Sequence, residues 1–430
     1  MSKQVDTVTT DPTESALLSE PDVNIDDIPI DVRDADAVAA AAREDTMVLN
    51  MGPNHPSTHG VLRLRLELEG ETVVGVDPDI GYLHTGIEKT GERLKYQQVI
   101  TLTDRMGYLD NMLDELAYVL AVEKLLGIDV PERVKWVRVL LSELERISSH
   151  LVWLGTHALD LGAMSMFMYG FRDRERVLDI KETISGVRMM TRYIMIGGLM
   201  ADLPPQFEPM VRDFLKFMPQ RLDEYEELLT RNDIWVERTK DIGILPADVA
   251  IQMGCSGPTL RGSGVPYDIR RVEPYTGYEN FDFEVIVGTR GDVYDRFRCR
   301  VLEMRESLKI IEQALDGMPE GPWRVDDRKI VPPPKDELVT SMESLIHHFK
   351  LWTEGLKPPV GEVYAAIEGA RGEMGYYIVS NGTGKPYRFH MRAPSFYNLE
   401  ALPRMAKGHL VSDIVAIIGT IDIVLGEVDR

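Results

Sequence analysis

The chain has 430 residues, of which 44% are hydrophobic, so it has enough apolar material for a large core. Lys and Arg number 48 and Asp and Glu number 70, which gives a formal net charge of −22 at pH 7. This charge argues against nucleic-acid binding, because neutralising phosphates requires a basic face. Only Cys255 and Cys299 are available as thiols, which excludes a disulfide framework and a cysteine-rich zinc or iron–sulfur site made by this chain alone.

The first 45 residues carry 12 acidic and 3 basic side chains, with irregular apolar spacing. This composition predicts a disordered acidic tail over 1–45. It resembles neither a signal peptide, which starts with basic residues, nor a mitochondrial presequence, which is poor in acids. No apolar run reaches the length of about 18 residues that a membrane span needs. We therefore expect a bacterial protein inside the cell that reaches a membrane only through a partner.

Residues 46–103 are predicted to form an N-terminal β domain. Leucine alternates with charged residues between 62 and 68, which is typical of an antiparallel strand with one buried face. The predicted strands are 47–51, 61–69 and 72–76. The loop 52–60 is rich in turn residues.

Residues 104–240 are predicted to form a bundle of long helices, because their apolar residues recur at helical spacing. Tyr108 is expected at the start of the first helix. A second helix is expected to begin at Asp129, with Glu132 completing a capping box, and to continue to Asp160. The remaining predicted helices are 172–200 and 206–231. A break is expected at Pro219 in the second of them.

Residues 241–430 are predicted to form a mixed α/β region that closes the site. Its predicted elements are a strand at 281–287, a helix at 292–315, a stiff connector at 331–335, a helical segment at 336–356 and β hairpins at 362–393. The whole chain is therefore assigned to the α+β class.

His55 and His59 flank a Pro-Ser-Thr insert. Two imidazoles four residues apart on a helix can share a metal ion, but Pro56 and Gly60 favour a loop, and no HExxH glutamate follows. Three interpretations stay open: a metal site, a polar loop directed into a cleft, and two ordinary loop histidines.

Tyr108, Thr156 and Asp160 are further candidates. A tyrosine near a helix start usually packs half-buried, but its phenol can also donate a hydrogen bond. Thr156 and Asp160 are four residues apart and share a helix face. Asp160 is either a solvated or capping carboxylate near the helix end or a carboxylate that orients an imidazole.

Methionines are concentrated in one part of the chain. They either fill a core flexibly or line a site for a long apolar ligand. The group comprises Met164, Met166, Met168, Met189, Met190, Met195 and Met200. No nucleotide site is expected, because the glycines of 369–375 lack the dinucleotide spacing and no Walker A motif occurs.

Five segments carry a family resemblance. They are 51–64 (MGPNHPSTHGVLRL), 81–89 (GYLHTGIEK), 341–350 (SMESLIHHFK), 413–420 (DIVAIIGT) and 426–430 (GEVDR). In sequence and order they closely resemble the 49-kDa subunit family of respiratory complex I, which in bacteria is the D subunit of NADH–quinone oxidoreductase. The resemblance covers about 46–430 and leaves out only the acidic tail.

That family is related to the large subunit of nickel–iron hydrogenases, so the resemblance implies a similar fold. Hydrogenases hold their metals with two Cys-x-x-Cys pairs. This chain has valine and glutamate in the corresponding part of 422–430. Because a nickel–iron site without thiolates is not credible, no metal site is expected, and the old metal cavity is free for another ligand.

The resemblance implies that this cavity binds a quinone headgroup. The family residues that hydrogen-bond the two quinone oxygens correspond to His59 and Tyr108, and the carboxylate paired with the histidine corresponds to Asp160. Thr156 and Val424 match cavity-lining positions. The resemblance also implies that the chain holds no cofactor alone and that electrons come from the terminal [4Fe–4S] cluster of the B subunit.

The implied activity is that of a proton-translocating NADH–quinone oxidoreductase, peripheral on the cytoplasmic side of the cell membrane. The implied partners are the B, C and I subunits and the membrane H subunit, which would admit the quinone tail. Arg105 is a cation expected to face the cluster. Thr85 and Met190 stand where some relatives have arginine and histidine near it.

Two other hypotheses are kept beside the quinone-site subunit. A non-catalytic scaffold of a hydrogenase-like membrane complex predicts the loss of His59 or Tyr108, and both are present. A stand-alone metalloenzyme would use His55, His59 and carboxylates, and metal analysis of the purified chain would detect it.

Overall fold

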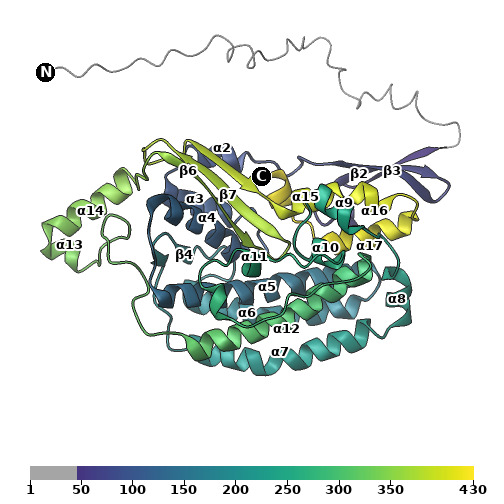
Figure 1. Ribbon diagram of the computed structural model, residues 1–430, viewed down its shortest axis with the longest axis horizontal. Helices are drawn as coiled ribbons and strands as arrows, with labels where there is room; N and C mark the ends of the chain where they lie inside the picture. The colour runs from purple at the N-terminus through teal and green to yellow at the C-terminus, as the bar shows by residue number, and fades with distance from the viewer. Residues whose placement is uncertain (1–45) are drawn as a thin grey trace, which may run out of the picture. The chain divides into compact units, whose positions relative to one another are not determined.

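The alternating leucines near the N-terminus form the buried face of an antiparallel sheet. The computed structural model describes residues 46–430, so the predicted tail at 1–45 lies outside the described residues. Leu64 and Leu66 are fully buried and share a core cluster with apolar residues of α17 (Val411–Ile421). The three predicted strands are confirmed and pair in the order β1 (Met47–Met51), β2 (Arg63–Glu69) and β3 (Thr72–Asp79) (Figure 1).

Long helices form a layer beside the C-terminal sheet (Figure 1). In α5 the apolar side chains of Leu140, Leu144, Ile147 and Leu151 recur at helical spacing and are at most 2% exposed. This buried helix packs against α4, α6 and α12. Within the predicted range 104–240 the long helices are α4 (Asn111–Leu126), α5 (Glu132–Asp160), α6 (Met164–Ser185) and α7 (Phe207–Leu229), and α12 (Val293–Gly317), from outside that range, packs with them.

The predicted helix over 172–200 is wrong at both ends. The observed helix α6 begins at Met164 and ends at Ser185, because Gly186 follows in the left-handed conformation (φ 79°), which glycine adopts without steric penalty. The chain then forms a short hairpin of β4 (Ile194–Met195) and β5 (Gly198–Leu199).

The predicted break at Pro219 is also wrong, since α7 continues through this proline. Val211, Phe214, Met218 and Leu222 recur along one buried face of the helix. Their burial, at roughly 1.5–3 kcal/mol for each large apolar side chain, offsets a proline penalty of about 3 kcal/mol.

Two predicted helix starts are corrected. Tyr108 does not open a helix: it lies in the turn between α3 (Tyr96–Thr103) and α4. Asp129 does not cap α5, because Pro131 occupies the N-cap position, and the Asp129 carboxylate instead contacts the Lys135 ammonium at 3.1 Å.

The C-terminal hairpins predicted over 362–393 are confirmed. They form an antiparallel sheet in the order β6 (Gly361–Glu368), β7 (Glu373–Ser380) and β8 (Arg388–Arg392). The predicted helix at 292–315 corresponds to α12, and the helical segment at 336–356 contains α13 (Glu337–Thr340) and α14 (Met342–Thr353).

The strand predicted at 281–287 is wrong, because this segment pairs with no other strand in the described part of the chain. Side chains of α12 bind its backbone instead. The N–H of Asp282 donates to Gln313 at 2.8 Å, and the N–H of Glu284 donates to Glu306 at 3.0 Å.

Short helices complete the fold, and the α+β assignment is confirmed. They are α2 (Ile87–Gly91), α8 (Asp233–Thr239), α9 (Ala247–Gln252), α10 (Gly257–Gly262), α11 (Ile269–Val272), α15 (Pro394–Glu400), α16 (Leu402–Ala406), α18 (Leu425–Asp429) and the 3-10 turns η3 (Pro56–Thr58) and η4 (Tyr278–Asn280). Residues 47–430 cluster as one unit by internal contacts, and divisions near 103 and 240 stay a prediction. Within 46–430, no helix is long and apolar enough to cross a membrane.

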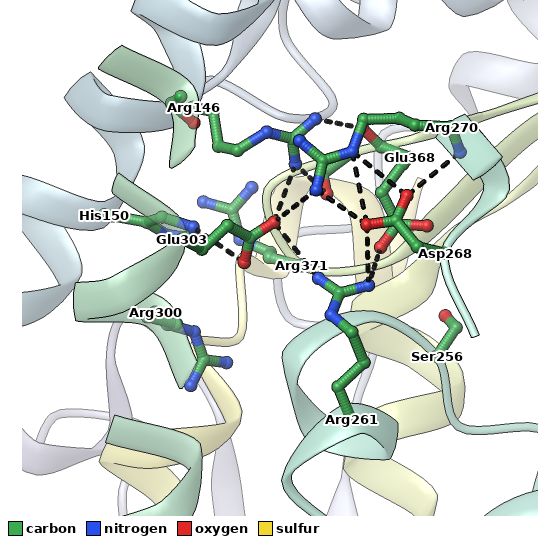
Figure 2. A network of polar contacts seen from close by, with 12 residues as sticks. Arg146, His150, Ser256, Arg261, Asp268, Arg270, Arg300, Glu303, Glu368 and Arg371 are labelled. Carbon is green, nitrogen blue, oxygen red and sulfur yellow. Dashed lines mark hydrogen bonds and ion pairs between the residues drawn. The ribbon is translucent and has the colours of Figure 1, made fainter. Parts of the chain in front are cut away.

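A buried ion-pair network links residues of α5, α10, α11, α12 and β6 (Figure 2). Its three guanidinium groups each contact at least two carboxylates. Arg261 binds Glu368 at 2.6 Å and Glu303 at 3.1 Å, and Arg270 binds Asp268 at 2.7 Å. We name this set the Arg261 network; its members are Glu143, Arg146, Arg261, Asp268, Arg270, Glu303 and Glu368.

Candidate functional site

The His59 loop is held in place by its own hydrogen bonds and by the C-terminal segment. The buried hydroxyl of Thr58 donates to the carbonyl of His55 at 2.7 Å. His59 follows η3 in the left-handed conformation (φ 49°). A methyl group at Gly60 would lie 3.0 Å from Leu425 Cδ1, so the loop packs in close contact with α18.

His59 and Asp160 form a close polar pair. The imidazole Nε2 lies 3.0 Å from the carboxylate Oδ2, and the two side chains are 13% and 9% exposed. Their relative orientation does not meet hydrogen-bond geometry, and neither atom has another hydrogen-bond partner within 46–430. Asp160 ends α5, so a rigid helix positions the carboxylate.

Tyr108 sits on a turn that buried acidic groups stabilise. The N–H of Gly107 donates to Asp114 Oδ2 at 2.7 Å, and a methyl group at Gly107 would lie 2.2 Å from that oxygen. The hydroxyl of Tyr108 has no hydrogen-bond partner among the described residues. Burial raises the pKa of the Tyr108 phenol. This phenol is therefore a neutral donor at ordinary pH that is free to bind a ligand.

The C-terminal segment connects the His59 loop with the Tyr108 turn. Leu425 contacts Gly60 on one side. On the other side, a methyl group at Gly426 would lie 3.2 Å from Tyr108 Cδ1 and 2.5 Å from the carbonyl oxygen of Met106. Glycine is required here for the close approach. Consecutive residues of α18 thus bring the imidazole loop and the phenol turn to one region.

Thr156 lies one turn before Asp160 on α5, and Val424 is the N-cap residue of α18. The Thr156 hydroxyl donates to the carbonyls of Val152 and Trp153 at 3.0 and 3.1 Å, so it is satisfied within its helix. Val424 is 1% exposed, and its N–H donates to the hydroxyl of Ser395 at 3.3 Å.

Arg105 differs from the other predicted site residues. Its guanidinium is exposed and contacts the carbonyl of Thr101 in the preceding turn of chain. Its own carbonyl oxygen lies against Gly426, 2.9 Å from the position that a methyl group would take there. The backbone of Arg105 thus supports the Tyr108 turn, while its charge is directed to the surface.

The histidine pair offers no metal centre with the residues described. Nδ1 of the exposed His55 accepts the N–H of Ser57 at 3.2 Å, while His59 faces Asp160. Within residues 46–430, no group of three or more His, Cys, Asp or Glu side chains could hold a metal ion.

Sequence reasoning missed the buried charges behind Tyr108. Arg371 binds Asp110 at 2.6 Å, and the carboxylates of Asp422 and Glu427 lie 3.7 and 3.9 Å from its Nε atom. These residues are far apart in sequence and follow no motif spacing. A usable signal is that Asp110, Asp114 and Asp422 interrupt apolar stretches, which buried charges do only when they are paired or functional.

The comparison with known proteins identifies the family. A sequence profile described as "Respiratory-chain NADH dehydrogenase, 49 Kd subunit" matches residues 160–430. The chain belongs to this family. The family assignment made from the sequence motifs is confirmed, and with it the assignment to an oxidoreductase complex of which the chain is one component.

Relatives match almost the full length of the chain. The second D subunit of the NADH-quinone oxidoreductase of Chloroflexus aurantiacus is 60% identical over 395 residues, which cover 91% of this chain and 96% of that protein. The first D subunit of the Roseiflexus castenholzii enzyme is 61% identical over 390 residues, covering 90% and 94%. The D subunit of the Geotalea uraniireducens enzyme is 54% identical over 389 residues, covering 90% and 100%.

Proposed function

We propose that the chain is the quinone-site subunit of a proton-translocating NADH–quinone oxidoreductase. The observation that carries the proposal is the arrangement around α18. Gly60, the residue that follows His59 of the His59–Asp160 pair, lies against Leu425, and the ring of Tyr108 lies against Gly426. Two proton donors of different kinds therefore flank one short segment, as a ligand with two carbonyl oxygens requires.

The chemistry of quinone reduction fits these side chains. Forming a quinol takes two electrons and two protons. A phenol and an imidazole N–H can each donate a hydrogen bond to an oxygen that gains negative charge, and then transfer the proton. The raised pKa keeps Tyr108 protonated until the quinone oxygen becomes basic enough to accept its proton. Asp160 holds and orients the imidazole of His59.

Apolar side chains near the pair suit the remainder of a quinone. Met164 and Met168, in the first turns of α6, are 60% and 55% exposed and follow Asp160 closely in the chain. Flexible thioethers adapt to a mobile apolar ligand. Met166, by contrast, is 1% exposed and fills the core. We assign Thr156 and Val424 to the wall of the headgroup site.

Partners of this chain follow from the same proposal. The electrons come from the [4Fe–4S] cluster of a B subunit, which the exposed Arg105 faces, and an H subunit in the membrane admits the quinone tail. The C and I subunits complete the contacts of a peripheral protein on the cytoplasmic side.

Exposed apolar residues support burial by partners; on α14 they are Met342, Leu345, Ile346, Phe349 and Trp352. We also propose that the fold is hydrogenase-like and that the former metal cavity has become the quinone site.

Replacing Tyr108 by phenylalanine tests the phenol. The substitution keeps the ring and removes the donor, so NADH–quinone turnover of the intact complex should fall by about 100-fold, the usual contribution of a positioned proton donor. NADH oxidation by a hydrophilic artificial acceptor, which takes electrons upstream, should persist. Tyr387→Phe is the matched control, because Tyr387 is 68% exposed. Normal turnover of short-chain quinones by Tyr108→Phe would overturn the assignment.

Substitutions of the pair separate the two donors. His59→Ala should lower quinone turnover less than Tyr108→Phe, because water can occupy the space of the imidazole. Asp160→Asn removes the anion that faces the imidazole, and it should lower quinone turnover without blocking assembly of the complex. Stoichiometric nickel or iron in the folded, purified chain would instead favour a metalloenzyme.

A further inference from the structure

A second set of buried ionisable groups lies behind Tyr108, outside the residues assigned to quinone. Its side chains are fully buried, apart from one that is 6% exposed. They come from the turn before α4, from α4, from the loop between β6 and β7, and from the C-terminal segment. We name this set the Arg371 cluster; its members are Asp110, Asp114, Arg371, Asp422 and Glu427.

The cluster has more acids than its cation can pair. Nη1 of Arg371 donates to Asp110 Oδ1 at 2.6 Å. Its other donors bind the carbonyl of Asp422 at 3.0 Å and the hydroxyl of Ser149 at 3.2 Å. The carboxyl groups of Asp422 and Glu427 therefore receive no hydrogen bond from the guanidinium. Arg300 of α12 also acts on Asp422, but four carboxyl groups outnumber these two guanidinium groups. In a dry interior they cannot all be ionised, so the cluster must contain a proton.

Several carboxyl oxygens in the cluster have no hydrogen-bond partner within 46–430. They are Oδ2 of Asp110, Oδ2 of Asp422 and Oε2 of Glu427. Glu427 is anchored through its other oxygen, which accepts the hydroxyl of Ser395. A fully buried carboxyl oxygen without a donor is destabilising, above all when it is charged, and a proton on it removes the charge. Glu427 therefore combines a fixed position with a free oxygen that can carry a proton.

The cluster is electrostatically linked to Tyr108. Gly426, the residue before Glu427, packs against the phenol ring. Burial raises the pKa of Tyr108, Arg371 opposes the rise, and Glu427 and Asp422 add to it. The charge of the carboxyl groups and the ionisation of the phenol thus influence each other.

We propose that the Arg371 cluster stores a proton on Glu427 and returns it to Tyr108 after the phenol has protonated the reduced quinone. The inference rests on the proposed function and deepens it. The O–H bond of Tyr108 breaks as an O–H bond forms on the quinone oxygen. The O–H bond of Glu427 then breaks as the phenol O–H re-forms, and the carboxylate of Glu427 is left beside Arg371. No electron moves in this second step, and one proton taken up from the bulk solvent later restores the O–H bond of Glu427.

The surroundings of Glu427 suit a group that stores a proton near neutral pH. Burial raises the pKa of Glu427 to about 7, with Asp110 and Asp422 adding to the rise and Arg371 and Ser395 opposing it. Asp114 and Tyr376 also face this carboxyl group, from α4 and β7. The stored proton is therefore present below about pH 7 and is progressively lost above it.

The test is Glu427→Gln in the intact complex. The amide keeps the acceptor for Ser395 but cannot release a proton. Rapid mixing should show a first quinone reduction at the normal rate, because Tyr108 still carries its own proton. Steady-state turnover should fall roughly tenfold to 100-fold, because reprotonation then limits the cycle. Glu400→Gln, at an exposed glutamate of the neighbouring helix α15, is the matched control and should leave both rates unchanged.

A second variant covers the case in which Glu427→Gln does not assemble. Ser395→Ala removes the hydroxyl that lowers the pKa of Glu427 and keeps the carboxyl group. The decline of steady-state turnover at alkaline pH should then move to higher pH. Unchanged turnover in Glu427→Gln, an equal slowing of first and later turnovers, or an unmoved pH profile in Ser395→Ala would each overturn the proton store. Normal turnover in Tyr108→Phe would instead overturn the proposed function itself.

Discussion

The Arg261 network and the Arg371 cluster are both buried and both contain four carboxyl groups, but they differ in the number of cations among them. Three guanidinium groups contact the carboxylates of the Arg261 network, and one contacts those of the Arg371 cluster. Figure 2 shows the guanidinium groups of Arg146, Arg261 and Arg270 converging on the acidic side chains, with Arg371 nearby.

The pKa directions follow this difference in pairing. Burial alone would raise the pKa of Asp268, but Arg270 and Arg261 outweigh it and lower the pKa to about 2. Burial also raises the pKa of Glu427, and there the single guanidinium of Arg371 does not compensate, so the pKa reaches about 7. Pairing opposes burial in both sets. It prevails at Asp268, Glu143 and Glu303, whose pKa values are lowered, but not at Glu368, whose pKa burial raises despite Arg261. We infer that the Arg261 network maintains the fold and that the Arg371 cluster exchanges protons.

The largest effect is expected from removing a cation of the Arg261 network. Arg261→Met keeps much of the volume but leaves Glu368 and Glu303 short of a partner in the interior. Breaking a buried ion pair in this way costs about 3–5 kcal/mol. Urea unfolding of the purified chain would measure the loss in the free energy of unfolding. A loss below about 1 kcal/mol, the range of exposed ion pairs, would show that the network does not stabilise the fold.

A smaller effect of opposite sign is expected from Glu427→Gln at alkaline pH. Because the pKa of Glu427 is raised in the folded state, the folded chain binds more protons than the unfolded chain between about pH 4.5 and 7. Its stability therefore falls as the pH rises through that window. A neutral glutamine removes this penalty, so the variant should be more stable than the natural chain by about 2–3 kcal/mol at pH 8.

The pH dependence of that variant is its own control. At pH 4 the glutamate is protonated in both states, and the difference in the free energy of unfolding should become small. A variant that is stabilised equally at pH 4 and pH 8, or destabilised at pH 8, would contradict a neutral Glu427. Combined with slower quinone turnover, the expected result is greater stability with lower activity, as is common for residues retained for function.

An intermediate effect is expected where the Arg371 cluster meets Tyr108. A methyl group at Gly426 would lie 2.5 Å from the carbonyl oxygen of Met106, so Gly426→Ala must move the Tyr108 turn. Such overpacking costs about 1–3 kcal/mol, and quinone turnover should fall with it. Gly361→Ala is the control, because its methyl group would approach no closer than 4.0 Å to Leu125. Normal turnover in Gly426→Ala would show that α18 does not position Tyr108 for quinone reduction.

Periodic segments were predictable from sequence, whereas segments held by distant partners were not. The leucines of β2 and the apolar face of α5 carry clear periods, so both elements were predicted close to their observed positions. Residues 281–287 alternate like a strand, but side chains of α12 take their backbone donors. Local pattern does not encode such a competitor.

The site was predictable in part. Spacing placed Thr156 and Asp160 on one face of a helix but left three interpretations of the His59 loop. The family resemblance predicted pairing of His59 with Asp160, and in the structure the two side chains lie 3.0 Å apart. The pairing of Asp110 with Arg371 spans 261 positions in the sequence, and no spacing rule connects residues that far apart.

The smallest effect is expected from an ion pair of the same chemistry at the surface, which isolates the contribution of burial. Arg65 on β2 donates to Asp77 on β3 at 2.7 Å, and the two side chains are 26% and 52% exposed. Water screens this pair and solvates the carboxylate when the arginine is removed, so Arg65→Gln should lower the free energy of unfolding by less than about 1 kcal/mol. Raising the salt concentration to about 1 M, where the screening length is about 3 Å, should abolish the difference, whereas the loss in Arg261→Met should persist because no ions enter the interior. If Arg65→Gln and Arg261→Met were equally costly, burial would not account for the strength of the Arg261 network, and the contrast with the Arg371 cluster would need another cause.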